Sequence, residues 1–396
     1  MDFDRIFLSR FLWEKDLNSY QRILDQRSVK YGGNTGVYSR LGLKISIRTL
    51  HRYKKENGIV RHDVSLTPTA VVNAVKEKKS GEGKHSGIRY LQLMIREDGM
   101  MVSRRQVQNV CTILGEQGQR PRKVGAERKL IYCPGPNFRW CMDGYDKLGR
   151  FGFNIHGCID EYSRYVLWLR AYSTNRRPEL IVKYYLKAVS EVGVAPMCTV
   201  SDFGNECNTV AVCQQFFYRS EETDQRHHRW TYSVLNVTIE AFWRRLRALS
   251  AQFWMDHFDE LVHAGLWDGN AVDMICAYAV YLPLINADLE RVRRQHNSHS
   301  IRRQDPANVR PSGRPEDIYG MPDVYGAECK GLKVTADEIQ RAIAYADVGE
   351  LDLDPPIPDD IWIVIKNWLL SNKIKITVNN AKSIYRQLRD MLIEIV

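Results

Sequence analysis

The chain has 396 residues, of which 44% are hydrophobic and 26% are charged, and its mean hydropathy is −0.39. This composition is typical of a globular protein, and the length exceeds what one hydrophobic core usually holds, so we expect two or three domains. The longest apolar run, 272–285, contains Asp273 and is too short to span a bilayer, and the first residues carry acids where a signal peptide has bases. We therefore expect neither a membrane protein nor a secreted one.

The nine cysteines are scattered along the chain. They form no CxxC pair, and no set of cysteine and histidine has zinc-finger spacing. This pattern favours a reducing compartment, in which most of the thiols are small core residues.

The positive charge is concentrated near the N-terminus. Residues 1–130 contain 26 Lys and Arg against 13 Asp and Glu, a net charge of +13, whereas residues 131–396 have a net charge of −3. A basic module joined to a nearly neutral one is typical of a nucleic-acid-binding region attached to another kind of domain. The alternative is that the charge serves only solubility.

The first region, residues 1–116, is predicted to be helical. A helix is expected over 46–58, where Ser46 can cap the N-terminus and Gly58 can end the helix. The basic segment 117–130 contains glycine and proline and is interpreted as a linker.

A second helical unit follows in the same region. It comprises a helix over 86–96, a turn at 97–99 and a helix that begins at Ser103, where Gln106 completes a capping-box pattern. The apolar stripe of this last helix consists of Val107, Val110, Cys111 and Leu114. Helix, short turn and polar-faced helix is the order of a helix-turn-helix, although plain helical hairpins share it. The candidate DNA contacts of the two units are Arg48, Arg52, Arg104 and Arg105.

After the linker, the pattern changes to short strands alternating with helices. Strands are expected over 138–142, 152–159, 165–171 and 197–200. Helices are expected over 178–192, 208–217 and 236–257, with more helix to about residue 294. This order predicts a mixed α/β sheet. An irregular stretch over 302–322 precedes tail helices over 335–346, 359–371 and 379–395.

Three acids stand out by their placement. Asp143 and Asp202 end the first and fourth predicted strands, and Glu240 lies in the first turns of the long helix. Acids at strand ends converge where α/β folds place their sites, and clustered carboxylates repel one another unless a cation neutralises them. Oxygen ligands favour Mg²⁺ or Mn²⁺, and two such ions support phosphoryl transfer. The alternative is that both aspartates are only turn or cap residues.

Other residues have simpler interpretations. Trp140 and Trp230 are expected in the core or a cleft wall rather than as base-stacking platforms, and His156 as a buried core histidine. The pair at 227–228 is expected in a polar loop. Three arginines of the long helix fit phosphate contacts and a solvated helix face equally well: Arg244, Arg245 and Arg247.

Residues 131–326 resemble the integrase core domain of retroviral-type integrases and transposases, in particular a set of integrase-core proteins of eukaryotes. The resemblance extends back over residues 40–115. The matching stretches are CPGPNFRWCMDGYDKLGRFGFNIHGCIDEYSRYVLWL, STNRRPELIVKYYLKAV, SDFGNEC, NVTIEAFWRRLR, NSHSIRR and PSGRPEDIYGMP.

The resemblance implies an RNase H-like fold and a polynucleotidyl transferase that cuts and joins DNA ends with Mg²⁺ or Mn²⁺. The family's two Asp and one Glu fall on Asp143, Asp202 and Glu240, separated by 58 and 37 residues. Glu206 would support this site, while Asn236 and Arg244 would contact DNA. The resemblance further implies mobile-element origin, a nuclear site of action in a eukaryote and a homo-oligomer bound to element ends and target DNA.

Two departures from the family pattern affect the site. Phe203 replaces a basic residue after the second Asp, and Val237 and Thr238 replace a Gln-Arg pair before the Glu. The family's zinc-binding N-terminal module is absent, so the helical units would replace it in DNA binding. The departures leave two alternatives open: a non-catalytic DNA-binding protein descended from an integrase, and a nuclease of RNase H type. Residues 327–396 form a fourth, helical region of unassigned role.

Overall fold

The computed structural model describes residues 52, 56, 63, 66–81, 83, 84, 86–114, 132–219, 227–232, 236–302, 310–351 and 353–395. The chain divides into two compact units. The N-terminal unit comprises Met1–Ser80 and Gly87–Arg122, and the core unit comprises Gly81–Ser86 and Lys123–Val396. Most of the helix expected over 46–58, with Arg48, and the linker expected over 117–130 lie outside the described residues.

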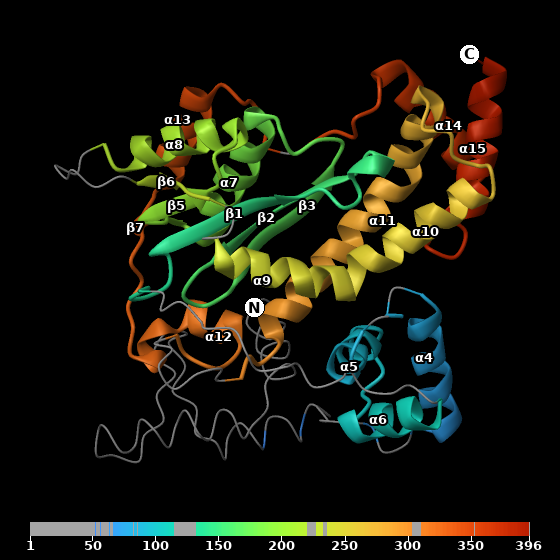
Figure 1. Cartoon of the computed structure of the whole chain (residues 1–396), viewed down its shortest axis with the longest axis horizontal. Helices are drawn as coiled ribbons and strands as arrows, with labels where there is room; N and C mark the ends of the chain where they lie inside the picture. Colours follow the sequence, from blue (N-terminus) through green and yellow to red (C-terminus); the bar gives the residue numbers. More distant parts are fainter. Residues whose placement is uncertain are drawn as a thin grey trace. The chain divides into compact units, whose positions relative to one another are not determined.

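The described part of the N-terminal unit contains three helices around a small core (Figure 1). They are α4 (Pro68–Ser80), α5 (Ile88–Glu97) and α6 (Arg104–Ile113). The predicted capping box at the start of α6 is confirmed, since the Ser103 and Gln106 side chains each accept a hydrogen bond from the other residue's backbone N–H. The apolar stripe of α6 is buried except for Leu114. The opposite face of α6 is exposed and carries Arg104 and Arg105.

The core unit is built on a five-stranded mixed sheet in the order β3-β2-β1-β5-β6. The strands are β1 (Arg139–Tyr145), β2 (Asn154–Asp160), β3 (Val166–Tyr172), β5 (Cys198–Ser201) and β6 (His228–Trp230). β1, β2 and β3 form an antiparallel meander, while β5 runs parallel to both β1 and β6. The predicted mixed α/β sheet is therefore confirmed.

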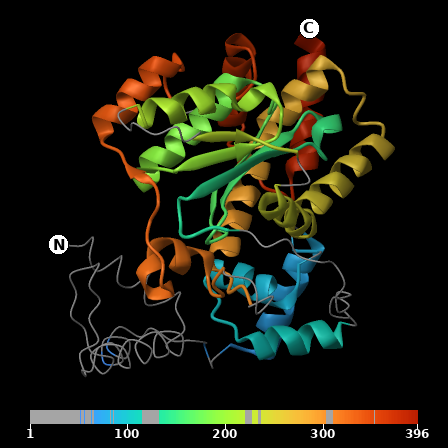
Figure 2. The ribbon, with the colours of Figure 1, turned by 60° about the vertical axis from the view of Figure 1, so that its left-hand side comes forward.

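Helices cover both faces of this sheet (Figures 1 and 2). α7 (Pro178–Val192) and α8 (Asn208–Phe217) lie on one face, and α9 (Val237–Leu246) and α11 (Ala271–Ser298) lie on the other. Trp140 is fully buried among the aromatic rings between the sheet and α7, as predicted.

Two details of the sheet differ from prediction. β1 extends to Tyr145 because that residue still pairs with Ile155, so Asp143 lies within the strand rather than at its end. β6 was not predicted, and the polar loop expected at 227–228 is wrong, since His228 begins this strand and is buried. The His228 ring lies within hydrogen-bond distance of the Thr199 and Ser201 hydroxyl groups, and burial lowers its pKa to about 4.

The long helix expected over 236–257 contains an interruption. α9 leads through five residues of π-helix, Arg247–Ala251, into α10 (Gln252–His263). A buried network holds this π-helical turn, since Ser250 Oγ and Trp254 Nε1 both donate to Asp288 Oδ2 of α11. Large apolar side chains at helical spacing along α9 and α10 are buried, apart from the half-buried Phe253.

The edge strand β3 is closed by α11. Asn286 accepts from the backbone N–H of Ala171 and donates to its carbonyl, and Asn297 forms the same pair of bonds with Val166. Two side-chain amides thus satisfy backbone groups that an edge strand otherwise presents to new partners.

α11 is the one described helix that is long and apolar enough to cross a membrane, with a mean hydropathy of 1.3 over its best window. However, 56% of that window is buried inside the protein, and the helix packs against β3 and the C-terminal helix. The central helix of a globular core passes the same test, so α11 is weak evidence for a membrane span.

Residues 327–396, expected as a separate helical region, pack onto the rest of the core unit. The short strand β7 (Leu332–Lys333) pairs with β4 (Val194–Ala195), and α13 (Ala336–Ala346) packs on α7 and α8. The last helix, α15 (Ala381–Ile395), packs along α11. α14 (Asp359–Ser371) lies between α13 and α15 in the chain. The helix α12 (Pro315–Gly320) and the 3-10 turn η5 (Pro322–Tyr325) precede this region.

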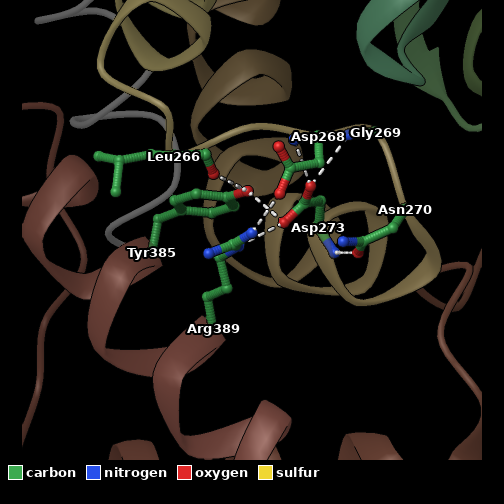
Figure 3. Close-up of polar contacts among 7 residues, drawn as sticks. All are labelled: Leu266, Asp268, Gly269, Asn270, Asp273, Tyr385 and Arg389. Atoms are coloured by element: carbon green, nitrogen blue, oxygen red, sulfur yellow. Dashed lines mark hydrogen bonds and ion pairs between the residues drawn. The ribbon is translucent and has the colours of Figure 1, made fainter.

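A buried ion pair anchors α15 (Figure 3). Asp273, near the start of α11, accepts from Arg389 Nε at 2.6 Å and from the Tyr385 hydroxyl at 3.2 Å. Its second oxygen accepts the backbone N–H groups of Asp268 and Gly269. Burial would raise the pKa of Asp273, but the Arg389 guanidinium and the backbone donors hold it below its usual value. The C-terminal helix is therefore an integral part of the core unit.

Candidate active site

Asn236 fixes the start of α9 against the central strand. Its side chain is buried, and Nδ2 donates to the carbonyl of Met142, the residue before Asp143, at 3.0 Å. One turn later, the backbone N–H of Glu240 donates to the Asn236 carbonyl. Asn236, expected to contact DNA, thus connects the strand of Asp143 to the helix of Glu240.

Trp243 links the same helix directly to Asp143. Its indole Nε1 donates to Asp143 Oδ2 at 2.8 Å, and Trp243 lies one turn beyond Glu240 on α9. Gly157 of β2, which pairs with Asp143, leaves room for this ring, because a Cβ atom there would lie 2.7 Å from Trp243 Cη2. The sequence pattern alone assigns Trp243 no role in the site. The signal that could have revealed its role is its spacing of three residues from the acid, which places both on one face of a helix.

Asp202 reaches the same end of the sheet from a parallel strand. It follows Ser201, the last residue of β5, and β5 runs parallel to β1. Parallel neighbours end at the same edge of a sheet, where α/β folds gather their functional groups. The acidic side chains of β1 and β5 are therefore directed to one place by the topology.

Glu206 adds a fourth carboxyl group close to Asp202. Its carboxyl folds back over Gly204, where a Cβ atom would lie 2.1 Å from Glu206 Oε2. Burial raises the pKa of Glu206, and the charge of Asp202 and a hydrogen bond between the two side chains raise it further. This coupling is that of two carboxyl groups sharing one site.

The electrostatics of Asp143 show that the three acids interact. Burial raises its pKa to about 7, the Trp243 hydrogen bond opposes this rise, and the negative charges of Asp202 and Glu240 add to it. An aspartate whose pKa is raised by burial and by neighbouring carboxylates is typical of a functional site. Asp202 and Glu240 thus lie near enough to Asp143 for their charges to raise its pKa.

Residues 131–312 match the family model described as "Integrase core domain". These residues form an integrase core domain. The mixed sheet with helices on both faces agrees with the RNase H-like fold that the resemblance implied. A search of curated proteins gives no match.

The donor set of the integrase core fits a hard divalent cation, because all four carboxyl groups offer oxygen ligands. Within the described ranges, no three Asp, Glu, His or Cys side chains lie close enough together to hold an ion by themselves. A bound Mg²⁺ would therefore have to complete its coordination with waters and substrate phosphates, as Mg²⁺ usually does. The Trp243 bond engages one carboxylate oxygen of Asp143, Oδ2.

The remaining predicted residues are distributed over both units. Arg244 is exposed one turn after Glu240 on α9. In the N-terminal unit, Arg104 and Arg105 are exposed, and Arg52 lies 3.8 Å from Glu56, with both side chains largely in solvent.

Two further predictions concern a buried histidine and a tryptophan. His156 is a buried core residue, as predicted, and its Nδ1 accepts from Trp168 Nε1 at 3.1 Å. Trp230 is 43% exposed, so it is not a core residue, and of its two expected places only a cleft wall remains. The reason is that β6 is the edge strand of the sheet, so no further strand covers its outer side.

The family's Gln-Arg pair is replaced by residues in two different environments. Val237 is exposed, whereas Thr238 is buried and its Oγ1 lies 3.1 Å from Arg310 Nη1. A guanidinium from a distant part of the chain therefore lies beside the position where the family has its arginine.

Proposed function

We propose that this integrase core protein is a metal-dependent polynucleotidyl transferase that cuts and joins DNA ends. The observation that carries the proposal is the raised pKa of Asp143, to about 7, with Asp202 and Glu240 among its causes. Asp143 of β1 therefore lies within electrostatic reach of an acid at the end of β5 and of one at the start of α9, and carboxylates so placed are stabilised by taking up a proton or by binding cations.

The proposed ligands of Mg²⁺ or Mn²⁺ are Asp143, Asp202 and Glu240, with Glu206 supporting Asp202. When bound, two such ions stabilise the attacking and leaving oxygens of an in-line displacement at phosphorus. The chain's own contribution is position: Asn236 holds α9 on β1, and Trp243 fixes the orientation of the Asp143 carboxylate. Arg244 would contact a neighbouring phosphate.

The N-terminal unit would bind DNA through the exposed face of α6, in the manner of a helix-turn-helix. Its support is the concentration of charge in residues 1–130, the three-helix core and the exposed Arg104 and Arg105. We also propose mobile-element origin, a nuclear site of action and a homo-oligomeric active form, as the family resemblance implies.

The second candidate is a non-catalytic DNA-binding protein. It is favoured by Val237 and Thr238, because neither side chain offers the phosphate-binding groups of the Gln-Arg pair. The four carboxyl groups argue for the enzyme, since a protein that only binds DNA gains nothing from acids that repel its phosphates.

The test is incubation of the full chain with labelled DNA ends and an unlabelled target plasmid in Mn²⁺. Shortened DNA strands together with labelled plasmid support a transferase, while shortened strands alone support a nuclease that uses water. DNA binding without either product favours the non-catalytic alternative. A matched RNA–DNA hybrid in the same assay separates an RNase H-type nuclease from one that cleaves DNA.

A further inference from the structure

Three large aromatic side chains are exposed beside the proposed catalytic carboxylates. Phe203 follows Asp202 directly and is 62% exposed, while Trp230 and Tyr232 are 43% and 68% exposed. Rings of this size usually bury most of their surface, so a group of exposed rings in one place indicates a binding surface.

Backbone pairing brings these residues together. Trp230 lies opposite Ser201 in the register of β6 and β5, and the N–H of Thr231 donates to the Ser201 carbonyl at 2.9 Å. The chain leaving β6 therefore runs beside the chain that carries Asp202 and Phe203. The result is direct contact between Phe203 and Tyr232, whose ring centroids lie 5.1 Å apart at 63°.

Trp230 contacts a buried residue of the sheet, while all three rings are exposed to solvent. Trp230 contacts the buried His228 ring at 4.4 Å, and His228 is in turn held between Thr199 and Ser201. We call Phe203, Trp230 and Tyr232 the aromatic platform.

The position of the platform selects its ligand. If the neighbouring carboxylates take a DNA phosphodiester, the bases of that strand lie within a few ångströms, because successive nucleotides rise by only about 3.4 Å. A base inside a duplex is covered on both faces by its neighbours, whereas an unpaired base has a free π-face for an aromatic ring. We propose that the aromatic platform binds an unpaired base of the strand held at the carboxylates, so that the protein prefers frayed or single-stranded DNA ends. This inference rests on the proposed function for the location of the strand.

The experiment uses the full chain and two duplexes of equal length, one blunt and one with two unpaired terminal nucleotides that include 2-aminopurine. Fluorescence is recorded immediately after mixing in Mg²⁺, before cleavage products accumulate. The platform predicts quenching of the unpaired 2-aminopurine and tighter binding of the frayed duplex. Phe203→Leu and Tyr232→Leu, which keep apolar volume but remove the ring, should reduce that preference roughly 5- to 100-fold.

A matched control is available in the same unit. Tyr345 is 60% exposed and its ring contacts Phe216 at 5.2 Å, so Tyr345→Leu removes a comparable ring elsewhere. This variant should quench and bind as the wild type does. Melting temperatures of all three variants confirm that folding is retained, which is expected because the replaced side chains are exposed.

The readout separates this inference from the catalytic proposal. Quenching that depends on Phe203 and Tyr232 in a protein without Mn²⁺-dependent cleavage would support the platform and contradict catalysis. Absence of quenching in the wild type, or an unchanged preference for frayed ends in both leucine variants, would overturn the platform while leaving the cleavage result to stand.

Discussion

Trp243 and Asp143 are joined by a hydrogen bond in which the indole Nε1 donates to carboxylate Oδ2 over 2.8 Å. Trp243 lies one turn beyond Glu240, so the helix that supplies one acid of the cluster also orients another. The bond lowers the pKa of Asp143 against burial and the two neighbouring carboxylates, which raise it to about 7. The tryptophan therefore orients the Asp143 carboxylate and favours its charged form.

Replacing Trp243 by Phe should lower activity near pH 7 and shift the acidic limb of the pH–rate profile upward. The substitution keeps an aromatic ring but removes a donor to a charged group, which corresponds to roughly a 10- to 100-fold effect. Trp254→Phe is the matched control, because Trp254 donates to Asp288 far along the same helical segment. It should reduce stability without moving the pH profile, and an equal shift in both variants would contradict the assignment.

Asp143→Asn should make the metal-free protein more stable at pH 8. The pKa of Asp143 is about 7 in the folded chain against an ordinary value of 3.8, so the folded state holds the proton more tightly. Asp143 therefore contributes a loss of stability on the order of 1–4 kcal/mol as the pH rises from about 4 through 7, and the Asn variant lacks this contribution. Urea denaturation in EDTA at pH 4, 6 and 8 measures the difference.

The same pair of proteins reports on metal binding. Adding Mg²⁺ or Mn²⁺ at pH 8 should stabilise the wild type and have a smaller effect on Asp143→Asn, because an ion that binds only the folded state raises the free energy of unfolding. Parallel stability curves for the two proteins, with and without the ions, would rule out a repelling carboxylate cluster at this position.

Restoring the family's Gln-Arg pair should have opposite effects at its two positions. Val237→Gln places an amide on an exposed position of α9 next to the site and should raise cleavage or strand transfer severalfold. Thr238→Arg places a guanidinium in a buried position already approached by Arg310 and should lower the melting temperature. Equal activity of Val237→Gln and wild type would show that the missing glutamine is not the limiting defect.

Arg104→Ala and Arg105→Ala should weaken DNA binding by the full chain and flatten its salt dependence. Each phosphate contact that is lost reduces the slope of log K against log salt by about 0.9, because fewer counterions are released. Arg341→Ala is the matched control, since Arg341 pairs with Asp337 on the surface of α13. If all three variants have the wild-type slope, α6 does not contact the phosphate backbone.

Much of the fold could be predicted because its signals are local. α7 and α8 begin and end at the predicted residues, and α7 carries Pro178 in its first turn and Gly193 at its end. β6 could not be predicted, since its three residues, His228, Arg229 and Trp230, have no strand pattern without β5 beside them. Pairing with a neighbour, not local propensity, forms such a strand.

The candidate site likewise has a part that could be predicted from the sequence and a part that could not. The three acids could be chosen from the sequence because their order and spacing match a family pattern. The bond between Trp243 and Asp143 and the buried amide of Asn236 depend on how α9 lies across β1, which is a tertiary contact without a local signal. The exposure of Trp230 likewise follows from the edge position of β6.

The central claim is that the acid cluster performs metal-dependent chemistry on DNA, and one measurement tests it most directly. The rate of Mn²⁺-dependent strand cleavage at a DNA end is compared for the wild type, Asp143→Asn and Asp337→Asn, the last being an exposed aspartate on α13. The proposed function predicts cleavage by the wild type and by Asp337→Asn, and a loss of roughly 100-fold or more in Asp143→Asn. Equal rates for all three proteins, or no cleavage by a wild-type protein that binds the same DNA, would contradict it.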